Sequence, residues 1–211
     1  MGDGIVREIL EVSKLMYEKG MVNAIEGNVS VRDGDRVYVT PSGVCKGYLE
    51  PGMICVTDME GNLLEGDLKP SSELRLHLAA YAMRGDARSV IHNHSPYATA
   101  YAIAGIPIES RAYPEMIVHY DRIEIVPYGT PSTDGIHEGM AGALGRGDVF
   151  LLANHGVVSV GKGAFDAFFK IETAESIAKI LYLVRTLGGE SPLSRPQLDE
   201  LYAMRRRMYG R

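Results

Sequence analysis

The run Ser89-Val-Ile-His-Asn-His-Ser-Pro96 carries two histidines one residue apart at the end of a short apolar segment. The apolar residues that lead into the pair favour a β-strand, in which residues i and i+2 point to the same face. The imidazoles of His92 and His94 can therefore converge on one ion. A third histidine, His155, lies in the run Leu151-Leu-Ala-Asn-His-Gly156, just before a glycine. Three neutral nitrogen ligands with one open position are typical of a catalytic zinc site, so the sequence predicts a metalloenzyme.

The remaining histidines, His77, His119 and His137, have no partner at a comparable spacing. A single histidine near the end of a strand is more often a hydrogen-bonded structural residue than a metal ligand. We therefore interpret these three as structural residues. Any one of His92, His94 and His155, taken alone, could also be a structural residue.

Segments with helical and extended patterns surround the histidine strand. Asp33-Gly-Asp35 and Met59-Glu-Gly-Asn62 have the composition of hairpin turns, which favours antiparallel pairing. We therefore expect one domain over residues 1–211, an α/β fold of three α/β/α layers with a largely antiparallel or mixed central sheet. Expected helices cover residues 5–19, 71–83, 134–144, 163–186 and the stretch from Pro196, with a short helix after Pro96. Expected strands cover residues 29–31, 36–40, 54–57, 89–93, 123–127, 149–152 and the stretch after His155, whereas the rest of 107–130 is ambiguous.

The composition limits the classes of partner that this chain is expected to have. It carries 22 basic and 27 acidic residues, a net charge of −5, which indicates neither a nucleic-acid nor a membrane partner. The N-terminus lacks the basic segment followed by an apolar one that marks a secretory signal. Cys45 and Cys55 form no CxxC pattern, so we interpret them as free thiols or small core residues. These features predict a cytoplasmic protein.

Glu73 lies in the run Lys69-Pro-Ser-Ser-Glu-Leu-Arg-Leu-His77 and has two possible roles. In the first, a serine caps the helix and Glu73 interacts with the helix dipole in the first turn. In the second, its carboxylate lies beside the metal as a general acid or base. The local sequence alone leaves both roles open.

Three pairs of small residues could bind a phosphate group, namely Gly27-Asn28, Ser42-Gly43 and Ser71-Ser72. Each pair taken alone is an ordinary turn or cap. Together they offer hydroxyl, amide and backbone N–H donors, and a helix that starts at Ser71-Ser72 would favour a dianion. The chain has no Walker motif, so a phosphate site would have to be built in this way.

Five short motifs occur in one order along the chain: Gly-Asn-Val-Ser, Thr-Pro-Ser-Gly, Pro-Ser-Ser-Glu, His-Asn-His and Asn-His-Gly. Their order resembles the class II aldolase/adducin family over nearly the whole chain. The resemblance implies a zinc-dependent aldolase that reversibly cleaves a ketose 1-phosphate of the L-fuculose 1-phosphate type. The products would be dihydroxyacetone phosphate and an aldehyde such as L-lactaldehyde.

The resemblance also implies a role for each motif residue. One Zn²⁺ ion per subunit would act as a Lewis acid, and other divalent metals are possible. Glu73 would lie near or on the metal and would remove or return the proton at the reacting carbon. The metal ligands would be His92, His94 and His155 with Glu73, and the substrate phosphate would be bound by Gly27, Asn28, Ser42, Gly43, Ser71 and Ser72.

Two tyrosines resemble residues that assist the family's aldolases. Tyr113, in Arg111-Ala-Tyr-Pro-Glu115, would handle the proton at the aldehyde oxygen. Tyr209 would reach a neighbouring active site from the C-terminal tail, and the alternative is a frayed tail residue without a role. The resemblance implies a homotetramer with its active sites at subunit interfaces, which would explain a tail that carries a tyrosine.

Other members of the family define the alternative functions. L-ribulose-5-phosphate 4-epimerases carry a different segment after the paired histidines, where this chain has Ala98-Thr-Ala-Tyr-Ala-Ile-Ala104. Methylthioribulose-1-phosphate dehydratase shares the zinc and the glutamate, so sequence separates it only weakly. An adducin-like, non-enzymatic module is less favoured, because the three histidines and Glu73 are all present.

Overall fold

The computed structural model describes residues 2–129 and 139–210. In this part of the chain nine strands form one sheet in the order β4-β3-β2-β1-β5-β9-β8-β7-β6. Neighbouring strands are antiparallel except for β7 and β8, which are parallel. The strands are β1 (Asn28–Asp33), β2 (Arg36–Val39), β3 (Cys55–Thr57), β4 (Leu63–Glu65), β5 (Ser89–Asn93), β6 (Ile108–Glu109), β7 (Arg122–Val126), β8 (Val149–Leu152) and β9 (Gly156–Gly161).

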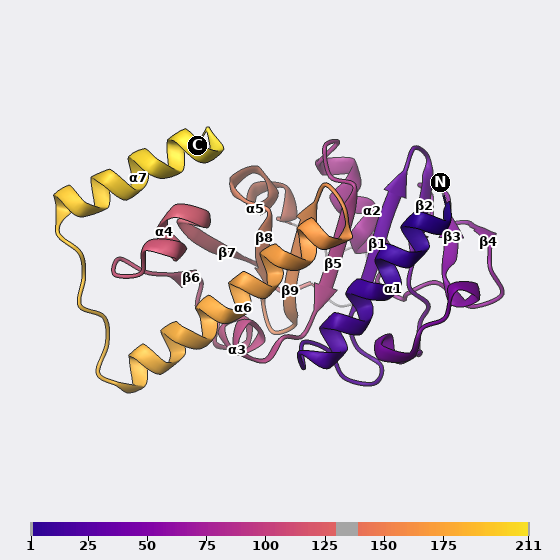
Figure 1. The fold of residues 1–211 in the computed structure, drawn as a ribbon, viewed down its shortest axis with the longest axis horizontal. Helices are drawn as coiled ribbons and strands as arrows, with labels where there is room; N and C mark the ends of the chain where they lie inside the picture. The colour runs from indigo at the N-terminus through magenta and orange to yellow at the C-terminus, as the bar shows by residue number, and fades with distance from the viewer. Residues whose placement is uncertain (1, 130–138, 211) are drawn as a thin grey trace.

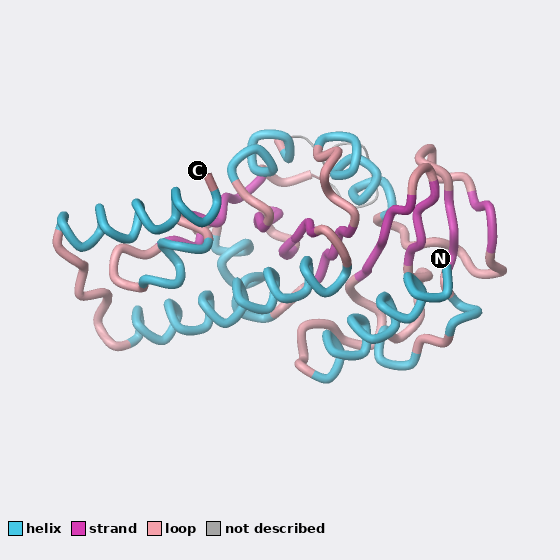
Figure 2. The backbone as a smooth tube through the Cα atoms, turned by 45° about the horizontal axis from the view of Figure 1, so that its top comes forward, coloured by secondary structure: helices cyan, strands magenta, loops and turns pink. Residues whose placement is uncertain are grey.

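Helices cover both faces of the sheet and give the three layers that the sequence predicts (Figure 1). Helices α1 (Gly2–Glu18), α3 (Pro96–Ala104) and α6 (Ala164–Thr186) pack on one face, and α2 (Leu74–Met83) and α5 (Met140–Arg146) pack on the other. Helix α7 (Arg195–Tyr209) packs on α4 (Pro114–His119), at the end of the fold opposite the N-terminal strands (Figure 2). Two short 3-10 helices, η1 (Lys46–Tyr48) and η2 (Pro51–Met53), precede β3.

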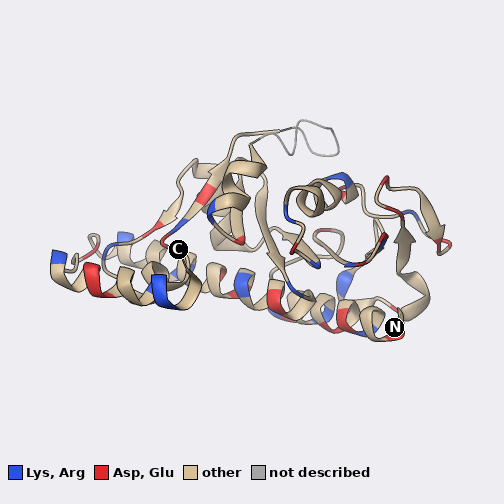
Figure 3. Cartoon of the chain, turned by 90° about the horizontal axis from the view of Figure 1, so that it is seen from above, with Lys and Arg blue, Asp and Glu red and all other residues tan. Residues whose placement is uncertain are grey.

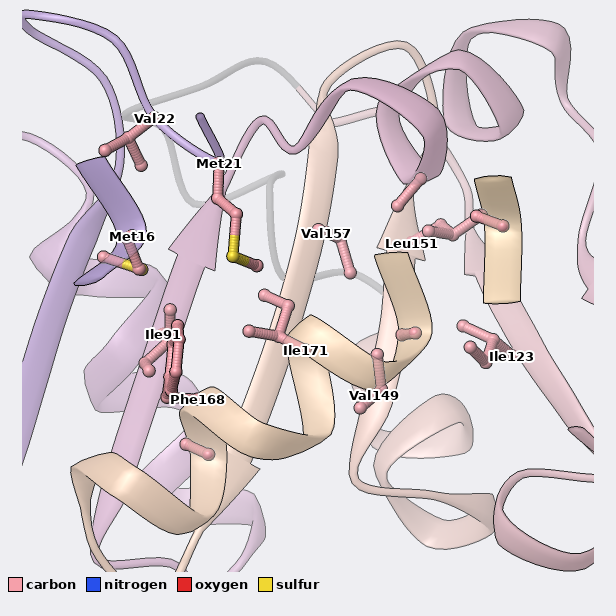
Figure 4. Close-up of a cluster of buried hydrophobic side chains, with 14 of the residues drawn as sticks. Met16, Met21, Val22, Ile91, Ile123, Val149, Leu151, Val157, Phe168 and Ile171 are labelled. Carbon is pink, nitrogen blue, oxygen red and sulfur yellow. The ribbon is translucent and has the colours of Figure 1, made fainter. Parts of the chain in front are cut away.

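Alternating side chains on the central strands build the two cores. Ile91 on β5 belongs to the core beneath α6, whereas its neighbour Val90 belongs to the core beneath α2. This is the two-residue period of a strand that is buried on both faces. Figure 4 shows Ile91 and Val157, from neighbouring strands, beside Phe168 and Ile171 of α6. Strand β5, which carries His92, is thus held between the two cores in the middle of the molecule.

Most predicted elements are present, with differences at their ends and in the short elements. The helix predicted from residue 71 begins at Leu74, because Ser71 accepts hydrogen bonds from the N–H groups of Glu73 and Leu74 in a preceding turn. Strand β4 has three exposed residues and therefore lacks the alternation that reveals a strand. Helix α4 and strand β6 lie in the ambiguous stretch 107–130. His137 and residues 134–138 of the predicted helix lie outside the described residues.

The hydropathy of the helices and the distribution of charge give no membrane-spanning pattern in the part of the chain that the structure describes. In the described residues, no helix combines the length and the apolar character needed to cross a bilayer. Acidic and basic residues are interspersed over the elements and are not segregated to one end of the fold (Figure 3).

Candidate metal centre and its pocket

The three histidines predicted as metal ligands come together at the centre of the sheet. His92 is on β5, His94 follows that strand, and His155 lies in the turn between β8 and β9. Each offers a nitrogen atom, and these atoms lie within 4.8 Å of one another. Pairing of β5 with β9 brings them together, because it aligns His92 with Val158, three residues after His155. This geometry allows one ion to be bound by all three imidazoles.

A hydrogen bond orients the imidazole of His92 for metal binding. Nδ1 of His92 donates to the carbonyl oxygen of Val157 at 3.1 Å, which leaves the lone pair on Nε2. Nε2 of His94 faces this atom at 3.2 Å, and Nδ1 of His94 lies 3.4 Å from Oε1 of Glu26. Burial lowers the pKa of His92 to about 3 despite the opposing effect of Glu73, so the imidazole is neutral at pH 7. The unprotonated Nε2 of His92, close to Nε2 of His94, can therefore contribute its lone pair to a shared cation.

Glu73 places its carboxylate against the histidines and does not cap the helix. It occupies the residue before α2, but its side chain makes no cap hydrogen bond. Oε1 lies 3.2 Å from Nε2 of His155, and Oε2 lies 3.4 Å from Nε2 of His92. The amide nitrogen of Asn28 donates to Oε2 at 2.8 Å. Burial opposes ionisation, but these histidines and Asn28 outweigh it and hold the pKa of the carboxyl below its usual range.

A chain of buried hydrogen bonds supports Glu73 from β1 and α2. The Tyr81 hydroxyl lies 2.6 Å from Oγ of Ser30, which lies 2.7 Å from Nδ1 of His77. Nε2 of His77 lies 2.5 Å from Oδ1 of Asn28. Because an amide oxygen can only accept, Nε2 carries the proton and Nδ1 accepts from Ser30. The chain thereby turns the amide nitrogen of Asn28 toward Glu73.

His77, interpreted from sequence as structural, is thus linked to Glu73 by two hydrogen bonds. It is fully buried, and burial lowers its pKa to about 4, so the ring is neutral and makes one donor and one acceptor contact. His77 follows Glu73 by four residues, which is the spacing of one helical turn. That spacing is the signal that could have identified it from sequence.

Replacing His77 by leucine should destabilise the fold and lower kcat, because it leaves Asn28 Oδ1 without its donor. Each buried polar group that loses its partner costs about 1–3 kcal/mol, and urea denaturation should show a loss of that order. His77→Gln keeps a donor for Asn28 and should retain more activity than His77→Leu when both are assayed as folded protein. Equal kcat in the two variants would mean that His77 affects stability only.

The residues predicted to bind phosphate line one pocket of about 200 Å³ beside the histidines. Its two loops are held together by backbone hydrogen bonds, from Ser42 N–H to the Lys69 carbonyl at 2.9 Å and from Ser71 N–H to the Thr40 carbonyl at 3.2 Å. The structure therefore brings the three small-residue turns to one place. Residues from the sequence prediction on its walls are Gly27, Asn28, Ser42, Gly43, Ser71, Ser72, Glu73, His94 and His155.

Two glycines are required by this arrangement. Gly27 has a left-handed φ of 74°, and a Cβ there would lie 2.4 Å from Cγ1 of Val22. At Gly156 a Cβ would lie 2.5 Å from the carbonyl oxygen of Asn93 and 2.8 Å from Cδ2 of His94. Gly156 therefore lets β9 approach the histidine rings closely. It belongs to the Asn-His-Gly motif, but the sequence pattern alone assigned it no role.

Neither predicted tyrosine lines this pocket within one chain. Tyr113 precedes α4 and packs, half-buried, against the core beneath α6. The hydroxyl of Tyr209 lies 2.7 Å from Nδ1 of His119, and both residues line a separate pocket of about 310 Å³. The structure of one chain therefore does not bring either tyrosine together with Glu73.

The fold and the site define a class of protein, and comparison with known families agrees with it. A family model described as the Class II Aldolase and Adducin N-terminal domain matches residues 7–182, so the chain belongs to this family. Class II aldolases are metal-dependent lyases of sugar phosphates, and the histidine cluster could bind their metal.

Relatives within the family differ in activity. An L-fuculose phosphate aldolase from Methanococcus maripaludis is 33% identical over 178 residues, 84% of this chain and 96% of the relative. A 3-oxo-tetronate 4-phosphate decarboxylase from Haemophilus influenzae is 36% identical over 187 residues, 86% of this chain and 87% of the relative. A solved structure of an L-fuculose 1-phosphate aldolase has a TM-score of 0.88 and 29% identity, covering 97% of this chain and 96% of the other.

Proposed function

We propose that this protein is a zinc-dependent aldolase that cleaves a ketose 1-phosphate of the L-fuculose 1-phosphate type. One observation carries the proposal, namely that Glu73 lies 3.2 and 3.4 Å from two of three converging imidazoles, beside the pocket lined by the small-residue turns. The products are dihydroxyacetone phosphate and an aldehyde such as L-lactaldehyde. The similarity to two L-fuculose phosphate aldolases, by sequence and by structure, supports this substrate class.

In this proposal each part of the pocket has one task. A zinc ion bound by His92, His94 and His155 supplies Lewis-acid chemistry at the substrate oxygens. The small-residue turns bind the phosphate and thereby fix the position of the sugar carbons. Glu73 is ionised and is held by Asn28, so it can take a proton from carbon in the condensation direction. In cleavage it would first take up the proton that the substrate hydroxyl loses, and would then return that proton to carbon.

Decarboxylation of a phosphorylated 3-oxo acid is the second candidate, because one relative with that activity is 36% identical. Cleavage next to a carbonyl also builds negative charge on carbon, so the same metal, phosphate pocket and proton donor would serve it. Methylthioribulose-1-phosphate dehydratase and L-ribulose-5-phosphate 4-epimerase activities remain alternatives within the family. An adducin-like module without activity is less favoured, because the histidines and Glu73 converge in one pocket.

We also propose a cytoplasmic homotetramer of this single domain, with each active site completed by a neighbouring subunit. Such a partner would bring Tyr113 and Tyr209 to a site from which they are separate in one chain. Exposed apolar side chains on α6 and directly after it offer a surface for a partner, and they include Ile180, Tyr182, Leu183 and Leu187.

A panel of phosphorylated substrates tests the proposed activity. The zinc-loaded protein should release dihydroxyacetone phosphate from L-fuculose 1-phosphate, measured with a coupled dehydrogenase. A 3-oxo-tetronate 4-phosphate should release little carbon dioxide under the same conditions. Carbon dioxide release without aldol cleavage would favour the decarboxylase instead, and turnover of neither substrate class would remove both candidates.

A further inference from the structure

Lys46 is a buried cation that belongs to none of the sequence motifs described above. It begins η1, and its side chain is only 2% exposed. Nζ donates to the carbonyl oxygen of Val44 at 2.7 Å, and no described acidic residue forms an ion pair with it. An ammonium group has three N–H donors, so the Val44 contact leaves two of them for another partner. A buried charge without a counter-charge is unfavourable unless a ligand supplies one.

The side chain of Lys46 lines the same pocket as Ser42, Gly43, Ser71 and Ser72. Those residues offer serine hydroxyls and the backbone N–H groups of Gly43 and Ser72, all of them neutral donors. The two acids on the pocket wall, Glu26 and Glu73, lie beside the histidines. Lys46 is therefore the one cationic side chain on the described wall of this pocket.

The surrounding structure holds Lys46 in this position. The adjacent Gly47 packs directly on α1, since a Cβ there would lie 2.3 Å from the Tyr17 ring. Backbone hydrogen bonds join the Ser42 and Ser71 loops to each other, so Lys46 and the serines belong to one rigid unit. Burial lowers the pKa of Lys46, which is the expected effect on an ammonium group that lacks an anion.

We propose that Lys46 binds the substrate phosphate as the one cationic side chain on the described pocket wall, and that it makes the pocket selective for phosphorylated sugars. Its free N–H groups donate to phosphate oxygens while the serines and backbone N–H groups bind the others. The inference rests on the proposed function, which places the phosphate in this pocket. It adds the residue that recognises the charge of the phosphate, whereas the small-residue turns recognise its shape.

Calorimetric titration of the metal-loaded protein with inorganic phosphate tests this role without turnover. Lys46→Met keeps the length of the side chain and removes the charge, and it should weaken phosphate binding about tenfold to hundredfold, as expected for loss of a charge-assisted hydrogen bond. Lys69→Met is the matched control, because Lys69 is exposed and lies outside the pocket wall. It should change binding by about twofold or less.

Thermal unfolding of the same variants is a second measurement. Together the two measurements distinguish failure of the Lys46 proposal from failure of the phosphate pocket. Without phosphate, Lys46→Met should unfold at the wild-type temperature or above it, because an unpaired buried charge is removed, and phosphate should stabilise it less than wild type. If Lys46→Met does not fold, Lys46→Gln keeps a donor for Val44 and should weaken phosphate binding in the same way. Unchanged phosphate affinity in a folded Lys46 variant overturns the proposal and leaves the aldolase function standing. Wild-type protein that binds no phosphate overturns the phosphate pocket itself.

Discussion

Replacing Glu73 by glutamine should lower kcat for aldol cleavage by about 100- to 10,000-fold, which is the usual range for loss of a general acid or base. The amide has the shape of the carboxylate and can still accept the hydrogen bond from Asn28, now 2.8 Å from Oε2. It cannot carry a proton to or from carbon at neutral pH. The fold, the metal content and the affinity for phosphate should therefore stay close to wild type.

Deuterium exchange separates the role of Glu73 from a general disturbance of the site. Wild-type enzyme should exchange a carbon-bound hydrogen of dihydroxyacetone phosphate with solvent, whereas Glu73→Gln should not. Glu11→Gln is the matched control, because Glu11 is exposed and lies outside the pocket wall. It should retain most of the exchange. Full exchange by Glu73→Gln would remove Glu73 from its proposed role.

Sequence patterns predict those parts of this site that are built from residues close to one another along the chain. The spacing of His92 and His94 is sufficient to bring them to one face, because the period of a strand is two residues. The order of the strands is not local, since β5 pairs with β1 on one side and with β9 on the other. The fold class could be predicted from hairpin turns and periodicity, but this pairing, which places His155 beside His92, could only be inferred from family resemblance.

Lys46 and His77 show why the rest of the site was not predicted. A lysine after a turn has the composition of a solvated loop, and its burial depends on α1 packing against η1. His77 gains its role from Asn28 and Ser30, which are 49 and 47 residues away along the chain. In both cases the role of the residue depends on tertiary contacts, which produce no periodic pattern in the sequence.

Removal of the metal should abolish turnover and lower the unfolding temperature. An ion held at 1,000 times its dissociation constant stabilises a protein by about 4 kcal/mol, because it binds the folded state only. For a chain of this size that corresponds to a decrease of roughly 8–16 °C. The metal-free site also leaves Nε2 of His92 and Nε2 of His94 facing each other at 3.2 Å. Dialysis against a chelator, followed by metal analysis and calorimetry, measures the effect.

His94→Ala is the control that assigns this effect to the histidine cluster. The variant lacks one of the three nitrogen ligands, so chelation should shift its unfolding temperature far less than that of wild type. Return of Zn²⁺ to the chelated wild-type protein should restore both activity and stability, and Mn²⁺ and Co²⁺ added in parallel show which metal serves best. If the metal-free wild-type protein keeps its activity, the metal-dependent function is wrong. If His94→Ala loses as much stability on chelation as wild type, the ion binds elsewhere, because three imidazoles within 4.8 Å of one another cannot lose one member without weakening a shared ion.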